Sequence, residues 1–439
     1  MNFLKNRRRR RPRISSQGRR LSAQMLERRQ LLAGDVEVFF RGDDLYVFGD
    51  QDDNSVEIRI DSLGNLVAEG LNETTIDGST DPVIIAFPTD VDVIDDVRVF
   101  LGRGDDSILI DGLTIDDDLY VSAGRGDDAI GLLRTEIGDD ASIYGGSGAL
   151  EFSLDLSSVD DDLRVYGSRE DDVIVFDESF VGDDTRVFTS SGNDTLIVRA
   201  SEHQDDVTIS TGSGEDFVAV VDGTQIGDDA FISLGRGDDS LFVRDSGVGD
   251  RVSAFGGRGD DAIGLENPDL NLRRTRVSSF ESEEVLGADE LIDAAVEQLV
   301  DSGARRPTIV DIAVNNGFTS LVDAVIATDL LGAISGSNPQ LTVFAPTNDA
   351  FATVDIPAGL DLATILQYHI VVGNVDSGGV LASETLTSFN NLTITIEDEA
   401  PIVNGQANLE IIDVRARNGI VHVIDAVLIP PPAPEADVA

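Results

Sequence analysis

Hydrophobic and polar positions in the middle of the chain repeat every 22 residues, apart from one interval of 23. In each period a pair of acids is followed by apolar side chains two and four residues after its second acid. These second acids are Asp106, Asp128, Asp172, Asp194, Asp216, Asp239 and Asp261, with Leu150 in the slot between Asp128 and Asp172. Ile130 and Leu132, which follow Asp128, are typical of the apolar positions. This period-two alternation predicts a short β-strand with one buried face.

A second series of acidic pairs runs between these, and its inward positions lie one and three residues after the pair. It comprises Asp96, Asp118, Asp140, Asp162, Asp184, Asp206 and Asp229, with Arg251 in the eighth slot. Leu119 and Val121 show the apolar positions, whereas an outward position such as Arg164 is polar. Each unit therefore reads as strand, acidic turn, strand, acidic turn. Stacked units predict an all-β parallel solenoid of about eight coils over residues 91–266, because 22 residues are too few for a propeller blade of about 40.

The remaining segments have a different character on each side of the repeat. Residues 35–90 contain short strand patterns, with a hairpin turn at residues 61–65, and we expect them to cap the first coil. Residues 267–303 form a linker with a helix at 289–300, for which Gly303 is a suitable stop. A domain boundary at 305–307 separates this linker from residues 304–432, where the repeat ends and helical patterns begin. Residues 433–439 form an unstructured tail.

Charge and composition narrow the classes of function. The formal net charge is −50, and residues 1–34 hold 11 Lys and Arg against one acid, so the rest of the chain carries −60. Such an acidic body repels nucleic acid and attracts cations. The absence of cysteine excludes disulfides and thiolate metal sites. No run of 18 apolar residues occurs, so we expect no transmembrane segment.

Stacking the repeat creates columns of like charge that need neutralising. Two carboxylates one coil apart, about 4.8 Å, repel by roughly 3–4 kcal/mol at an effective dielectric constant near 20. Arginine precedes the acidic pair in five repeats, as Arg103, Arg125, Arg169, Arg236 and Arg258. Calcium is the alternative, because it favours carboxylate and carbonyl oxygens in glycine-rich loops. Both interpretations stay open at this point.

The segment GGRGDDAIG at residues 256–264 resembles the nonapeptide of the haemolysin-type calcium repeats. In that family the aspartate at the sixth position is a calcium ligand. Carried over, the resemblance implies calcium at Asp106, Asp128, Asp194, Asp216, Asp239 and Asp261. This chain departs from the family, because one match occurs per 22 residues instead of consecutive nonapeptides.

The C-terminal segments LTVFAPTNDAF (341–351), ILQYHIV (365–371), LTITI (392–396) and RNGIVHVIDAVLIP (417–430) resemble a fasciclin domain. The resemblance implies a compact α+β domain with a sheet wedge and flanking helices, and an extracellular adhesive or matrix role. It also implies Asn348, Asp349, Tyr368 and His369 as contact positions. From the residues alone, His369 and His422 read as packing or hydrogen-bonding side chains, because both alternate with apolar neighbours.

Residues 26–33, LERRQLLA, resemble a segment that opens many large surface or exported proteins of planctomycete bacteria. This resemblance implies export, although the basic arm formed by residues 1–34 lacks the apolar core of a standard signal peptide.

Together these observations predict a non-catalytic extracellular or cell-surface protein in which an acidic solenoid spacer presents a fasciclin adhesion domain. The expected partners are cell-surface or matrix proteins or polysaccharide, and calcium is the only expected cofactor. Two alternatives remain: a cation-binding structural protein of a surface layer, and a β-helix enzyme that cleaves polysaccharide. Glycosidic cleavage needs two carboxylates in different environments, about 5–9.5 Å apart. The acids here occupy equivalent turns, which disfavours the enzyme.

Overall fold

The computed structural model describes residues 34–89, 93–266, 268–270, 274–282, 285, 287–357, 360–383, 385–390, 393–397 and 402–431. The basic residues 1–33, including the planctomycete-like segment 26–33, lie outside the described residues, and so does the tail from residue 432. No helix among the described residues is long and apolar enough to cross a membrane.

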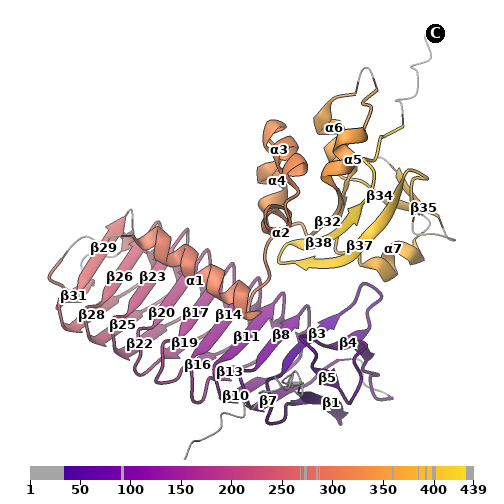
Figure 1. Cartoon of the computed structure of the whole chain (residues 1–439). Coiled ribbons are helices and arrows are strands. Elements are labelled where there is room, and N and C mark those ends of the chain that lie inside the picture. Colours follow the sequence, from indigo (N-terminus) through magenta and orange to yellow (C-terminus); the bar gives the residue numbers. More distant parts are fainter. Residues whose placement is uncertain are drawn as a thin grey trace, which may run out of the picture. The chain divides into compact units, whose positions relative to one another are not determined.

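The repeats fold into a parallel β-solenoid whose strands form three sheets (Figure 1). The first sheet has, among the described residues, 12 strands in the order β31 (Arg276–Ser278), β28 (Val252–Arg258), β25 (Ala230–Arg236), β22 (Val207–Ser213), β19 (Thr185–Phe188), β16 (Leu163–Tyr166), β13 (Ala141–Tyr144), β10 (Leu119–Arg125), β7 (Val97–Arg103), β2 (Asp44–Phe48), β1 (Asp35–Arg41) and β5 (Thr75–Ile76). The second sheet has 11 described strands in the order β29 (Ala262–Glu266), β26 (Ser240–Arg244), β23 (Phe217–Val221), β20 (Thr195–Arg199), β17 (Val173–Asp177), β14 (Leu150–Asp155), β11 (Asp128–Leu133), β8 (Ser107–Asp111), β3 (Ser55–Ile60), β4 (Leu66–Gly70) and β6 (Val83–Ile84).

The coils stack in the predicted phase. Leu119 of β10 pairs with Val97 of β7 and with Ala141 of β13, a shift of 22 residues on each side. The predicted inward residues of both series are buried, as Ile130 and Val121 show at 0% exposure. Leu265 is an exception at 46% exposure. It lies on β29, the last strand of its sheet among the described residues.

Each coil also contains a third strand that the repeat pattern did not predict. These strands of two residues form a sheet that has eight described members, in the order β30 (Asp269–Leu270), β27 (Gly247–Val248), β24 (Gln225–Ile226), β21 (Glu202–His203), β18 (Phe180–Val181), β15 (Ser158–Val159), β12 (Glu136–Ile137) and β9 (Thr114–Ile115). Two residues are too few to show a period, since only one side chain per coil points inward. That side chain is aliphatic in most coils, as in Ile137 and Val181, but it is a histidine at His203. The His203 Nδ1 lies 2.7 Å from Thr185 Oγ1.

Residues 35–84 continue the solenoid and close its first end. β2 pairs in parallel with β7, and β3 pairs in parallel with β8, so this segment supplies further rungs. The hairpin from β3 to β4 turns at the predicted place, where Asp61 Oδ1 accepts the amide hydrogens of Leu63 and Asn65.

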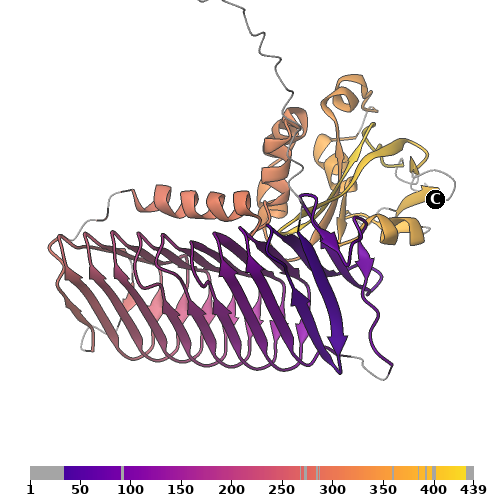
Figure 2. The same cartoon turned by 60° about the horizontal axis from the view of Figure 1, so that its bottom comes forward.

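Helix α1 (Ala288–Ser302) lies along the outer face of the 11-stranded sheet (Figures 1 and 2). Its buried residues Ile292, Ala295 and Leu299 belong to one apolar cluster with sheet residues such as Val175 and Ile197. A parallel sheet covered in this way is apolar on both faces. Gly303, at φ 87°, ends the helix as the sequence indicated.

The C-terminal part is an α+β domain built on a mixed sheet. Its described strands have the order β33 (Ile370–Val372), β32 (Leu341–Pro346), β38 (Gly419–Ile424), β37 (Ala407–Ala416), β36 (Ile402–Val403), β35 (Thr393–Glu397) and β34 (Thr385–Thr387). β32 and β38 are parallel, and the other named pairs are antiparallel. The helices are α2 (Ile309–Asn315), α3 (Thr319–Ala327), α4 (Leu331–Ser335), α5 (Asn348–Thr353), α6 (Leu362–Tyr368) and α7 (Ser377–Ala382). Thr308 and Asp311 form a capping box on α2, and Thr347 caps α5.

Candidate functional site

The six aspartates predicted as calcium ligands lie in the turn between the 12-stranded and the 11-stranded sheet. The sequence predicted both acids of each pair in a turn, and the structure places the two at different depths. The first acid, as in Asp127, is exposed, whereas the second is buried to 2% exposure or less. The six buried residues are Asp106, Asp128, Asp194, Asp216, Asp239 and Asp261. Their burial follows from the turn, which directs the second side chain under the strand ends.

One oxygen of each buried carboxylate holds the neighbouring coil. Asp128 Oδ1 accepts the amide hydrogen of Asp106 at 3.0 Å, and Asp239 Oδ1 accepts that of Asp216 at 2.9 Å. Asp261 Oδ1 accepts the amide hydrogen of Asp239 at 3.0 Å. Each aspartate therefore supplies the acceptor that a backbone amide needs at the corner of the coil.

The other oxygen is buried without a hydrogen-bond partner among the described residues in five of these aspartates: Asp106, Asp128, Asp216, Asp239 and Asp261. Burial raises the pKa of Asp106 to about 6 and the pKa of Asp128 to about 7. Asp194 differs, because Thr189 donates its hydroxyl hydrogen to Asp194 Oδ2 at 2.5 Å. A buried carboxylate oxygen that lacks a donor favours a proton or a cation. The five carboxylate oxygens, which lack donors within the described part of the chain, therefore fit a bound cation.

The glycines of these turns are explained by the stacking of the coils. A Cβ atom on Gly126 would lie 1.8 Å from Gly104 O, and one on Gly237 would lie 1.6 Å from Gly214 O. Both glycines also have positive φ, at 123° and 134°. Each of the five aspartates offers one oxygen without a partner among the described residues, whereas calcium takes six to eight oxygens. A bound ion would need ligands from more than one coil.

The closest groups of carboxylates lie in the second series instead. Asp139, Asp140 and Asp161 have oxygens within 4.8 Å of one another, and equivalent groups recur along this edge. Arginines on the strands neutralise part of this charge: Arg164 pairs with both Asp140 and Asp162, with Nη1 at 2.6 Å from Asp140 Oδ2. Screening by arginine is therefore built into the second series, from strand positions such as Arg164.

The predicted contact residues of the C-terminal domain divide into an exposed pair and a buried pair. Asn348 and Asp349 begin α5 and are exposed. Asn348 Oδ1 accepts the amide hydrogen of Ser320 at 3.0 Å, and its Nδ2 donates to Gly317 O at 2.8 Å. Asn348 thus joins α5 to the start of α3, while the Asp349 side chain remains at the surface.

Tyr368 and His369 are 2% exposed and hold the interior of the domain together. The Tyr368 hydroxyl donates to Thr393 O at 2.7 Å and accepts from Asn404 Nδ2 at 2.8 Å. His369 Nδ1 lies 2.8 Å from Ile365 O, and His369 Nε2 accepts the amide hydrogen of Leu428 at 2.8 Å. Burial lowers the pKa of His369 to about 4, so the ring is neutral. A partner can reach Asn348 and Asp349 directly, but Tyr368 and His369 only by way of the backbone they position.

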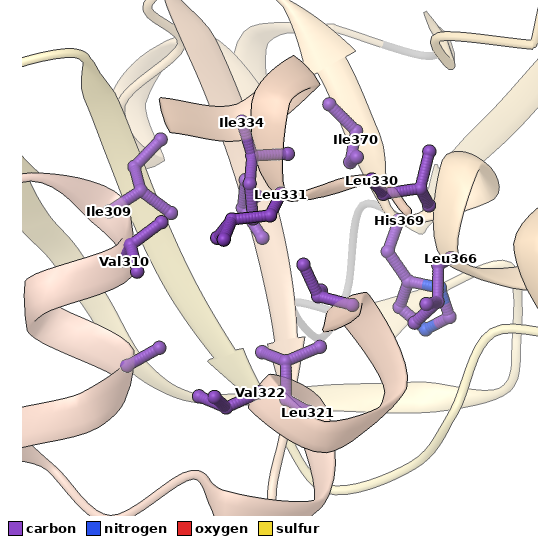
Figure 3. Close-up of a pocket in the computed structure, with 13 residues that line it drawn as sticks. Ile309, Val310, Leu321, Val322, Leu330, Leu331, Ile334, Leu366, His369 and Ile370 are labelled. Carbon is purple, nitrogen blue, oxygen red and sulfur yellow. The ribbon is translucent and has the colours of Figure 1, made fainter. Parts of the chain in front are cut away.

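His369 also borders a pocket between helices α2, α3, α4 and α6 (Figure 3). Its other lining residues are aliphatic, for example Ile309, Leu321 and Leu366. The free volume is only about 40 Å³, far below the ~300 Å³ of a small-molecule site. The pocket is a loosely packed part of the domain core.

The most strongly bonded charged residues were not identified from the sequence. Arg305 and Arg417 are 5% and 4% exposed, and they contact two solenoid aspartates that are 1% exposed, Asp155 and Asp177. Arg417 Nε donates to Asp155 Oδ1 at 2.9 Å and its Nη2 donates to Asp177 Oδ2 at 3.1 Å. Arg305 pairs with both aspartates, and Arg199 pairs with Asp177. These residues form a buried ion network between the solenoid and the α+β domain.

The arginines of this network change the pKa values of its two aspartates in different ways. Burial would raise the pKa of Asp177, but Arg199, Arg305 and Arg417 outweigh burial and lower it. For Asp155, burial prevails over Arg305 and Arg417, and the pKa is raised. The sequence contained only a weak signal for this network. An acid lies five residues after the buried turn position in only some repeats, as Asp155 does after Leu150 and Asp177 after Asp172.

The fold defines a class, namely a β-solenoid followed by a compact α+β domain. Residues 316–430 match the Fasciclin domain family. Two relatives come from Synechocystis sp. (strain ATCC 27184 / PCC 6803 / Kazusa): Protein sll1483 is 40% identical over 151 residues, 31% of this chain and 81% of the relative, and Uncharacterized protein sll1735 is 37% identical over 133 residues, 28% and 98%. Transforming growth factor-beta-induced protein ig-h3 of Sus scrofa is 34% identical over 136 residues, 28% of this chain and 19% of the relative. The chain therefore belongs to the fasciclin family through its C-terminal domain.

Proposed function

We propose that this protein is a non-catalytic adhesion or matrix protein of the cell surface or extracellular space. The fasciclin domain is the observation that carries the proposal, since the family resemblance implies an adhesive role. The buried network of Arg305, Arg417, Asp155 and Asp177 supports a solenoid that holds this domain in place. The expected partner is a cell-surface or matrix protein, or a polysaccharide, that meets the exposed start of α5.

The adhesion proposal is tested by changing Asp349 in the full chain. Asp349→Lys reverses the charge of an exposed side chain at the proposed contact, and Asp301→Lys makes the same change at an exposed position of α1, outside the fasciclin domain. Binding of the immobilised protein to whole cells and to extracellular-matrix fractions is then measured as a function of concentration. We expect saturable binding that Asp349→Lys weakens at least fivefold and Asp301→Lys leaves intact. Equal binding by all three proteins would contradict a contact at α5, and no saturable binding by the wild type would contradict adhesion.

A second candidate function, binding of calcium along the solenoid, is supported by five buried carboxylate oxygens that have no partner in the part of the chain that the structure describes. An ion that binds only the folded coil stabilises it by about 2.7 kcal/mol at a hundredfold excess over its dissociation constant. Thermal melting is therefore compared in millimolar calcium chloride and in sodium chloride of equal ionic strength, because monovalent salt only screens the repulsion.

The matched variants decide whether calcium has ordered sites. Asp128→Asn with Asp261→Asn removes two candidate ligands, whereas Asp301→Asn with Asp323→Asn removes two exposed charges from helices. We expect calcium to raise the melting temperature of the wild type and of the helix variant beyond the sodium value, and to lose this effect in the ligand variant. Equal melting temperatures in both salts would contradict ordered calcium sites, and the aspartates would then serve only as hydrogen-bond acceptors between coils.

A further inference from the structure

A charged cavity lies where the β3–β4 hairpin of the solenoid meets Arg306 and strand β37. Its volume is about 340 Å³, within the range of small-ligand sites. Three arginines line it, Arg59, Arg306 and Arg415, together with Glu57 and two other acids. A cluster of three guanidinium groups is unexpected in a body whose residues after position 34 carry a net charge of −60.

The three acids of the cavity already have partners. Glu57 Oε1 lies 2.5 Å from Arg306 Nη2, an ion pair without hydrogen-bond alignment, and Glu69 Oε2 accepts a hydrogen bond from Arg59 Nη2 at 2.9 Å. Asp413 accepts the amide and hydroxyl hydrogens of Ser377. The lining is therefore balanced in formal charge, and each of its acids lies in an ion pair or accepts a hydrogen bond.

Several guanidinium donors of the cavity have no hydrogen-bond partner among the described residues. Arg59 is 7% exposed, and its Nε and Nη1 have no hydrogen-bond partner within the part of the chain that the structure describes. Arg59 Nε is 3.5 Å from Glu57 Oε1, an ion-pair distance without hydrogen-bond alignment. Arg415 Nε reaches the same oxygen only at 3.9 Å. Burial first, and then the charge of Arg59, lower the pKa of Arg415. Buried guanidinium hydrogens without an acceptor are unfavourable, because their desolvation is not compensated.

We infer that this cavity binds one oxyanion, a carboxylate, sulfate or phosphate group, between Arg59 and Arg415. Guanidinium groups present parallel N–H donors that match the oxygens of such anions. Leu71, at 38% exposure, lies on the rim, so the cavity reaches the surface and the oxyanion can belong to a larger molecule. The inference is independent of the adhesion proposal, since neither Asn348 nor Asp349 lines this cavity.

The experiment is isothermal titration of the full chain at constant ionic strength. Sodium sulfate, sodium phosphate, sodium acetate and an oligogalacturonate are added separately, so that a free inorganic anion is distinguished from an acidic polysaccharide. Arg415→Gln removes one donor group, and Leu71→Trp fills the cavity without changing its charges. Arg251→Gln is the matched control, because Arg251 is an exposed solenoid arginine that pairs with Asp229.

We expect saturable binding of at least one of the four probes, with a stoichiometry of one. Arg415→Gln and Leu71→Trp should each weaken it at least tenfold, while Arg251→Gln should bind as the wild type does. If Arg415→Gln fails to fold, Leu71→Trp alone decides the question. Absence of saturable binding would show that water satisfies these donors and would overturn the inference, as would unchanged binding by Leu71→Trp.

Discussion

Replacing Arg417 by leucine tests whether the buried ion network joins the fasciclin domain to the solenoid. The change removes the 2.9 Å bond to Asp155 and the 3.1 Å bond to Asp177, both at sites that water does not reach. Asp155 would keep Arg305 Nε, at 3.2 Å, as its sole cationic partner among the described residues. Breaking a buried pair by removing one partner costs about 3–5 kcal/mol, because an uncompensated charge stays buried. We expect a loss near the lower end, about 3 kcal/mol, since Arg305 remains.

The free energy of unfolding is measured by urea denaturation, followed by far-ultraviolet circular dichroism. Urea is preferred to guanidinium, because a salt would screen the charges under test. Two controls separate burial from charge. Arg251→Leu breaks an exposed pair with Asp229, which should cost less than about 1 kcal/mol. Arg417→Leu combined with Asp155→Leu removes both charges and should recover part of the loss.

The loss in the free energy of unfolding shows whether the network stabilises the folded chain. If Arg417→Leu costs no more than Arg251→Leu, the network does not stabilise the folded chain. If the double variant is as unstable as the sum of the single variants, Arg417 and Asp155 do not interact energetically. Either result would refute the view that this network joins the fasciclin domain to the solenoid.

Four further predictions concern single side chains. Ile174→Asp places a charge at a position that is 0% exposed, and circular dichroism should show loss of the solenoid, because an unpaired buried charge costs several kcal/mol. Burial lowers the pKa of His203 to about 4, so the folded state resists protonation of this ring. The free energy of unfolding is therefore highest above about pH 6.5 and falls by about 3 kcal/mol as the pH drops toward 4. Thermal melting of His203→Val should show a smaller loss of stability over this range. Burial raises the pKa of Asp128 to about 7, so protonation stabilises the folded state at low pH, and this stabilisation is lost as the pH rises through 7. With a chelator present, the melting temperature of Asp128→Asn should therefore exceed that of the wild type by the most near pH 8. Tyr368→Phe leaves Thr393 O and the Asn404 amide without their partner and should cost about 1–3 kcal/mol in urea denaturation.

The stacking phase was predictable because it depends on a pattern that repeats locally. An inward side chain recurs at the same offset in each coil, so Ile130 and Val121 are identified without knowledge of their neighbours. The third strand was missed for the opposite reason, since a two-residue strand such as β12 contributes a single inward side chain. The aspartates lie in the predicted turns, but the repeat did not predict the depth of either acid of a pair. Whether Asp127 or Asp128 turns inward depends on how closely successive glycine turns approach, which the alternation of acids and glycines does not reveal.

The sequence by itself determined the repeat length, the solenoid and the fasciclin domain, because periodicity and short motifs act within a few tens of residues. Only the tertiary structure decided which charges are buried together. Asp155 and Arg417 are 262 positions apart, and a hydrogen bond between them leaves no period and no motif in the chain. The same holds for Arg59 and Arg415, which line one cavity from strands β3 and β37. Such pairs exist because folding brings strands β3, β14 and β17 of the solenoid against the last strands of the fasciclin domain, where the low dielectric makes each unpaired charge costly.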